Sequence, residues 1–78
     1  MPPEQLRQML RVQPFVPFRI YLSGGQSYDV HGPEWAVVMG PITFVGIPGE
    51  TADGDRGYII ANRHITHTEP RDEIEPVH

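Results

Sequence analysis

Histidines are the first residues to examine for chemistry, because they titrate near neutral pH, bind metals and transfer protons. The chain has four of them: His31, His64, His67 and His78. His64 and His67 are three apart, a spacing that brings two imidazoles together on a helix but sends them to opposite faces of a strand. With Glu69 they could ligate a metal, but we interpret them as polar residues facing solvent. We expect no metal and no cofactor.

Two glycine-containing segments resemble ligand-binding loops at first, but neither completes the sequence pattern of such a loop. Asp53-Gly54-Asp55 resembles the start of a calcium loop, but the chain continues into Arg56-Gly57-Tyr58 without the further oxygen ligands or the closing glutamate. Gly24-Gly25 is not followed by a helix whose N-terminus could hold a phosphate. The first segment predicts an exposed acidic loop and the second predicts a hairpin turn.

No group of residues in the sequence supports nucleophilic catalysis. The chain has no cysteine, and nothing in the pattern places a histidine beside Ser23 or Ser27, which flank the glycine turn. We therefore predict that the protein is not an enzyme and has no catalytic residues.

The first part of the chain mixes arginines with aromatic residues, a combination that could stack on single-stranded bases. The residues are Arg7, Arg11, Arg19, Phe15, Phe18 and Tyr21. The competing interpretation places the arginines on a solvated face and the phenylalanines over the core. Trp35, the single tryptophan, allows the same two interpretations, either an interface hot spot or a large aromatic at the end of a small core.

The charge of the chain is acidic and unevenly spread. Ten acids stand against six arginines and no lysine, for a formal charge of −4. This balance disfavours nucleic-acid binding, which uses clusters of Lys and Arg. Residues 1–20 carry +2, residues 21–49 carry −2 and residues 50–78 carry −4. Such ends would allow head-to-tail contacts between copies that weaken with salt.

The N-terminal segment predicts a short amphipathic helix. Residues 2 and 3 are prolines, which suit a first helical turn, and Leu6, Met9 and Leu10 recur three and four apart on one face. Pro14 stops the run. A helix of about ten residues does not persist alone in water, so its apolar face must lie on the rest of the protein.

The remaining chain predicts short strands. Phe18, Ile20 and Leu22 alternate with polar residues, as in a strand with one buried face, and the glycine turn leads to a second strand at 26–31. The segment 35–39 is uniformly apolar, so either both of its faces are covered or one meets another subunit.

The last third predicts three more strands and a tail. A fourth strand covers 42–47, an exposed loop covers 50–57, and a fifth strand covers 58–61. A tight or 3₁₀-like turn at 62–64 precedes a last strand at 65–68. The segment 70–78 is rich in proline and acids, and we expect it to be a flexible tail.

These elements predict a single, mainly β domain over residues 1–69. The architecture we expect is a short N-terminal helix followed by a five- or six-stranded, strongly bent antiparallel sheet, or a small SH3-like or Sm-like barrel, because closure leaves few exposed edges. The alternative is an open antiparallel meander with the helix across one face.

Four segments carry a resemblance to a group of short, uncharacterised bacterial proteins that is common in planctomycetes. They are Glu4–Met9 (E-x-L-R-x-M), Gln13–Ile20 (Q-P-F-x-P-F-R-I), His31–Glu34 (H-x-P-E) and the isoleucine-rich Tyr58–Thr66. The resemblance covers about residues 4 to 68. It implies no known activity.

A second resemblance, in architecture, is to the bacterial Sm-like RNA chaperones. Phe18–Gly25 is similar to their first strand and turn, and Arg63–Thr66 to their last turn. Where their RNA-contacting motif has an aromatic residue, a lysine and a histidine, this chain has Ala61, Asn62 and Arg63. The resemblance therefore implies self-assembly, as in their rings, rather than RNA binding.

We therefore expect a small non-catalytic protein-interaction module that associates with other copies of itself. The residues expected to face a partner are Arg7, Arg11, Arg19, Tyr21 and Trp35. The alternative is an Sm-like single-stranded RNA-binding protein. No hydrophobic run approaches the roughly 20 residues of a membrane span, so we expect a soluble, cytoplasmic protein with no membrane partner.

Overall fold

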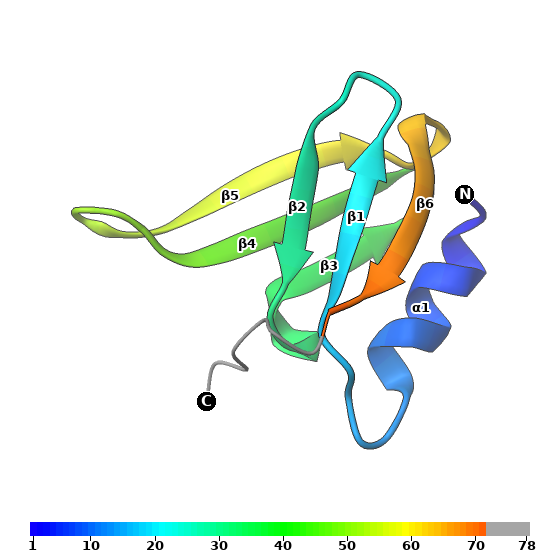
Figure 1. Ribbon diagram of the computed structural model, residues 1–78, viewed down its shortest axis with the longest axis horizontal. Coiled ribbons are helices and arrows are strands. Elements are labelled where there is room, and N and C mark those ends of the chain that lie inside the picture. Colours follow the sequence, from blue (N-terminus) through cyan, green and yellow to red (C-terminus); the bar gives the residue numbers. More distant parts are fainter. Residues whose placement is uncertain (72–78) are drawn as a thin grey trace.

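The computed structural model describes residues 1–71, which form one α-helix, two 3₁₀ helices and six strands (Figure 1). The elements in chain order are α1 (Pro3–Arg11), β1 (Phe18–Leu22), β2 (Ser27–Val30), η1 (Pro33–Trp35), β3 (Ala36–Met39), β4 (Ile42–Thr51), β5 (Gly54–Ala61), η2 (Asn62–His64) and β6 (Ile65–Pro70). The predicted mainly β fold with a short N-terminal helix is confirmed.

Helix α1 forms where the periodicity predicts it, with a proline in its first turn and its apolar face toward the sheets. Leu6 is fully buried, and Met9 and Leu10 pack against the core partly buried. The helix ends at Arg11. The N–H of the next residue, Val12, donates to the carbonyl of Gln8 and so closes the last turn. Because nine residues are too few for a helix to persist alone, packing on the sheets must supply its stability.

The first sheet has the order β2-β1-β6, with β1 antiparallel to both neighbours. The predicted glycine hairpin joins β1 to β2. Leu22 N–H donates to the carbonyl of Gln26 at 2.9 Å, and Gly25 has a φ of 95°, a backbone conformation that glycine adopts without steric cost. Phe18 and Ile20 on β1 are fully buried, as the alternation predicts, and Leu22 is partly buried.

The second sheet has the order β3-β4-β5, and its β4–β5 hairpin is longer than the sequence predicts. The predicted loop at 50–57 is wrong, because most of these residues belong to the ends of β4 and β5. The far part of this hairpin, residues 47–56, projects beyond the rest of the protein, and we call it the arm (Figure 1). A register shift between Ile47 and Thr51 accommodates Pro48, which cannot donate a ladder hydrogen bond.

The strand predicted at 35–39 is present but one residue shorter than predicted. Trp35 ends the 3₁₀ helix η1, and strand β3 begins only at Ala36. Ala36 is buried and Val38 is partly buried, whereas Val37 and Met39 are exposed. Strand β3 is therefore covered on one face and open on the other.

The two sheets enclose one core, with the first sheet in front of the second in Figure 1. Its buried apolar residues are Leu6, Phe18, Ile20, Val30, Ala36, Val45, Ile60 and Ile65. Strand β2 contacts β4, and α1 contacts β3 on the other side of the molecule. Within residues 1–71 no strand pairing joins the two sheets into a closed barrel.

The predicted turn at 62–64 is confirmed as the 3₁₀ helix η2. Strand β6 then runs to Pro70, and Arg71 N–H donates to the carbonyl of Pro17 at 2.9 Å. The rest of the predicted flexible tail, residues 72–78, lies outside the described residues. Neither α1 nor any other helix in residues 1–71 has the length and hydropathy to cross a membrane.

Candidate protein-interaction surface

The outer face of the second sheet, turned away from the core, carries a continuous set of apolar side chains that we call the apolar face. Its members are Val37, Met39, Ile42, Phe44, Ile59 and Ala61. Val37 on β3 pairs with Phe44 on β4, which pairs with Ile59 on β5, so the three stand in one row across the sheet. Directly opposite residues on one face have Cβ atoms about 5 Å apart, close enough for their side chains to touch.

This row holds three of the four exposed large apolar residues of the second sheet. Val37 is 53% exposed, Phe44 38% and Ile59 67%, and Met39 in the adjoining row is 54% exposed. The alternate positions of the same strands face the core, where Val45 and Ile60 are buried. Single exposed apolar residues are ordinary, but a contiguous group on one face marks an interaction surface.

Trp35 lies at the edge of the apolar face, because its indole covers Gly46 on β4. A Cβ built on Gly46 would lie 2.8 Å from Trp35 Cε3, so only glycine leaves room for the ring there. Trp35 is half-buried, and its indole N–H is buried without a hydrogen-bond partner among residues 1–71. Of the five residues predicted to face a partner, Trp35 alone lies beside the apolar face.

The arm at one end of the apolar face carries a net negative charge, because its three acids outnumber its one arginine, Arg56, whose guanidinium carbon lies 5.6 Å from the centroid of the Tyr58 ring. Glu50, Asp53 and Asp55 gather at its tip, where Asp55 Oδ1 accepts a hydrogen bond from Gly49 N–H at 2.9 Å. Glu50 accepts a hydrogen bond from the hydroxyl of Tyr58, and this bond raises the pKa of Tyr58 above its usual 10.0.

The opposite end of the apolar face is basic. Arg63 in η2 follows the end of β5, is exposed, and makes no ion pair within residues 1–71. The apolar face therefore lies between a cationic end and an anionic end. Sequence reasoning missed Phe44, Ile59 and Arg63 as site residues.

Arg19 and Tyr21 lie on the outer face of the other sheet, on β1, inside a polar network. Arg19 Nε and Nη2 donate to the two carboxylate oxygens of Asp29 on β2 at 2.5 and 3.2 Å. These bonds, with a further one to Tyr21, hold the pKa of Arg19 above its usual range. Arg19 is therefore already paired within the chain.

Tyr21 is held from the β6 side. Its ring stacks on that of His67 with centroids 4.5 Å apart, and its hydroxyl accepts a hydrogen bond from Arg71 at 2.5 Å. His67 Nε2 lies 3.3 Å from a carboxylate oxygen of Glu69. The sequence predicts that Tyr21 faces a partner, but its side chain is held in this network instead.

The predicted mixture of arginines and aromatic rings does not form one surface. Arg7 pairs with Glu4 on the same helix at 2.5 Å, while Arg11 is exposed near the end of that helix. Phe18 is fully buried, and Phe15 packs against the core with its ring centroid 6.1 Å from that of Phe18. Of the five residues predicted to face a partner, the fold brings together Arg19 and Tyr21 on β1.

The histidines do not gather either. His67 lies on β6, whereas His64 lies in η2 and lines a hollow between the β1–β2 hairpin and β5. Within residues 1–71 no three His, Asp or Glu side chains are arranged to hold a metal ion.

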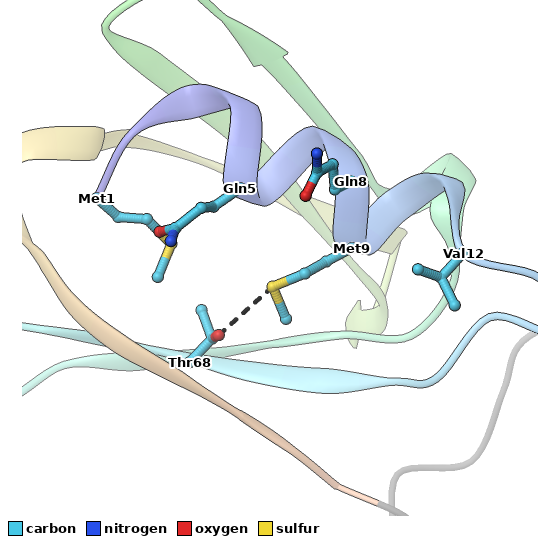
Figure 2. Close-up of a pocket in the computed structure, with 6 residues that line it drawn as sticks. All are labelled: Met1, Gln5, Gln8, Met9, Val12 and Thr68. Atoms are coloured by element: carbon cyan, nitrogen blue, oxygen red, sulfur yellow. Dashed lines mark hydrogen bonds between the residues drawn. The ribbon is translucent and has the colours of Figure 1, made fainter.

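A hollow of about 370 Å³ lies between α1 and β6 (Figure 2). Its lining residues are Met1, Gln5, Gln8, Met9, Val12 and Thr68. Thr68 Oγ1 lies 3.5 Å from Met9 Sδ, a weak hydrogen bond that ties β6 to the helix. Its lining offers amides, a hydroxyl and apolar groups.

Comparison with known proteins gives no relative from which a function could be taken: no protein-family model matches the chain, and neither does any curated protein or solved structure. The resemblances to short bacterial proteins and to Sm-like proteins stay predictions.

Proposed function

We propose that the protein is a small non-catalytic interaction module that associates with a second copy of itself through the apolar face. The observation that carries the proposal is the exposed row of Val37, Phe44 and Ile59 across three neighbouring strands. Burying such a row removes apolar area from water, the main favourable term in protein association.

The apolar composition of this face makes it complementary to a second copy of itself. Its six members are all apolar, so two identical faces meet without opposing like charges or unpaired polar side chains. A two-fold interface needs this self-complementarity, since each patch must match itself. The arginines that would otherwise suggest a separate acidic partner, Arg7 and Arg19, are paired within the chain.

The strength of the pairing follows from the exposed fractions. The four most exposed members are already about half covered, so complete burial contributes about 1 kcal/mol each, or about 8 kcal/mol over two copies. Association costs at least about 4 kcal/mol in lost translational and rotational freedom. The apolar face alone therefore supports a weak dimer, with a dissociation constant of about a millimolar.

The test is the solution mass across a concentration series, by sedimentation equilibrium and NMR diffusion, at low and at high salt. Val37→Asp places a carboxylate in the row and should abolish association. Val16→Asp is the matched control, because Val16 is 42% exposed but lies in the α1–β1 connection, away from the apolar face. A wild-type protein that stays strictly monomeric up to about a millimolar in both salts refutes the proposal.

Single-stranded RNA binding, the alternative predicted from the sequence, is tested separately. Its affinity would be greatest at low salt, because phosphate contacts release counterions. A gel-shift assay with mixed RNA at low salt that shows no shift removes it. The cytoplasmic location stays a prediction, to be checked by cell fractionation.

A further inference from the structure

The apolar face has two ends of opposite charge, and this restricts how two copies can pair. Along β5, Asp55 lies four residues before Ile59 and Arg63 lies four residues after it. At about 3.3 Å per residue in a strand, each charge lies roughly 13 Å or less from the central row. This inference rests on the proposed self-association through the apolar face.

Two identical sheets can meet face to face about a two-fold axis in only two principal ways. With the axis parallel to the strands, each end of the face meets the same end of the other copy, so acidic arm meets acidic arm and Arg63 meets Arg63. With the axis perpendicular to the strands, the ends are exchanged, and Arg63 of each copy meets the arm of the other. Like charges placed together disfavour the first arrangement, and opposite charges favour the second.

The area of the face indicates that its ends must take part. The six members occupy three strands about 4.8 Å apart and two cross-strand rows about 6.8 Å apart, which gives a flat area of roughly 200 Å². A stable interface buries about 800 Å² on each partner. The additional contact area has to come from what adjoins the apolar face along the strands, namely the arm at one end and η2 at the other.

We infer that two copies pair with their strands antiparallel across the interface, the axis passing through the row of Val37, Phe44 and Ile59, and that Arg63 of each copy contacts the acidic arm of the other. Each ion pair then occurs twice in the dimer. The arm, which adds little to the core of its own domain, supplies the recognition of the second copy.

Charge reversal at each end tests this arrangement. Arg63→Glu replaces two attractive contacts by two repulsive ones, and Asp53→Arg places a cation at the arm tip two residues from Asp55, so each variant alone should dimerise at least about tenfold more weakly. Asp53 is chosen because it is exposed at the arm tip and accepts none of the hydrogen bonds that shape the arm. An equal mixture of the two variants should associate again, because both contacts become complementary in the mixed dimer. Arg11→Glu is the control, as it changes the same charge on α1, away from the face.

The outcomes separate the inference from the proposal beneath it. If the wild type dimerises but Arg63→Glu and Asp53→Arg do so equally well, the perpendicular axis is wrong and self-association stands. That result is expected for the parallel axis, where reversal replaces one pair of like charges by another. If the wild type never dimerises, both are overturned. Far-UV circular dichroism confirms that each variant is folded.

A crosslinking measurement tests the direction of the two-fold axis without changing any charge. The chain has no cysteine, so an introduced one is unique. On the perpendicular axis Ile59→Cys lies opposite itself and is joined by a short bismaleimide to give a covalent dimer. On the parallel axis Ile59→Cys lies opposite position 37 instead, and only a mixture with Val37→Cys gives the crosslink. The second result overturns the inference.

Discussion

The buried contact between Thr43 and Asn62 holds the basic end of the apolar face in place. Thr43 Oγ1 donates to Asn62 Oδ1 at 2.5 Å, with the two residues 1% and 3% exposed. Asn62 Nδ2 donates to the carbonyl of Gly40 at 2.9 Å, and its backbone N–H donates to that of Pro41 at 2.8 Å. Asn62 thus joins the end of β5 to the β3–β4 turn, immediately before Arg63.

Replacing Thr43 by valine keeps the shape of the side chain but leaves the Asn62 oxygen buried without its donor. An unsatisfied buried acceptor costs about 1–3 kcal/mol. In a domain of this size 1 kcal/mol shifts Tm by about 4–8 °C, so we expect Tm to fall by roughly 5–20 °C. Thr43→Ser is the control, because it keeps the hydroxyl and loses one methyl group, worth about 1 kcal/mol.

The measurements are thermal and urea unfolding followed by far-UV circular dichroism. In a double-mutant cycle with Asn62→Ala, the combined loss should fall short of the sum of the single losses by about 1 kcal/mol, because both substitutions break the same bond. If Thr43→Val is as stable as the wild type, the hydroxyl does not satisfy Asn62 and the reasoning is refuted.

Three further perturbations test other parts of the structure. Val45→Ala removes two carbons from a fully buried side chain and should cost about 2 kcal/mol in urea unfolding; a loss below about 0.5 kcal/mol would show that the site is not close-packed. Gly46→Ala forces the indole of Trp35 to move, costs about 1–3 kcal/mol, and should shift tryptophan fluorescence to the red, whereas unchanged emission would place the ring elsewhere. The raised pKa of Tyr58 gives stability that is present below pH 10.0 and is lost as pH rises above it; Glu50→Gln should lower this pKa in a tyrosinate absorbance titration, and an unmoved titration would show that the carboxylate is not its cause.

The elements that the sequence predicts correctly are those whose signal is local. The alternation of Phe18 and Ile20 with polar neighbours depends only on the two-residue period of a strand, and the helix depends only on spacings of three and four. The glycine hairpin depends on the freedom of glycine to adopt positive φ, which Gly25 uses with a φ of 95°.

The arm could not be predicted in this way. Its residues are small, polar and acidic, which is typical of loops, yet they form strands because backbone groups pair across the hairpin whatever the side chains are. Gly46 opposite Gly57, the pair next to the arm, is an example of a pair that holds by backbone alone. Propensity reasoning weighs side chains, so it assigns such a segment to a loop.

The candidate site was missed for a related reason. Val37, Phe44 and Ile59 are far apart in the chain, and only the register of two strand pairs puts them in one row. The uniformly apolar segment 35–39 carried a partial signal, since a strand apolar on both faces needs cover on both. Arg19 was assigned to a partner because its pairing with Asp29 likewise depends on register.

The apolar face also bears on protein engineering. A redesign aimed at solubility would replace exposed Phe44 and Ile59 by charged residues, as standard rules for surface composition advise. The core beneath would be unaffected, because Val45 and Ile60 point the other way. Such a variant would be easier to purify and concentrate, and would have lost the surface on which the proposed association depends. Solubility and the proposed association therefore place opposite requirements on the same side chains.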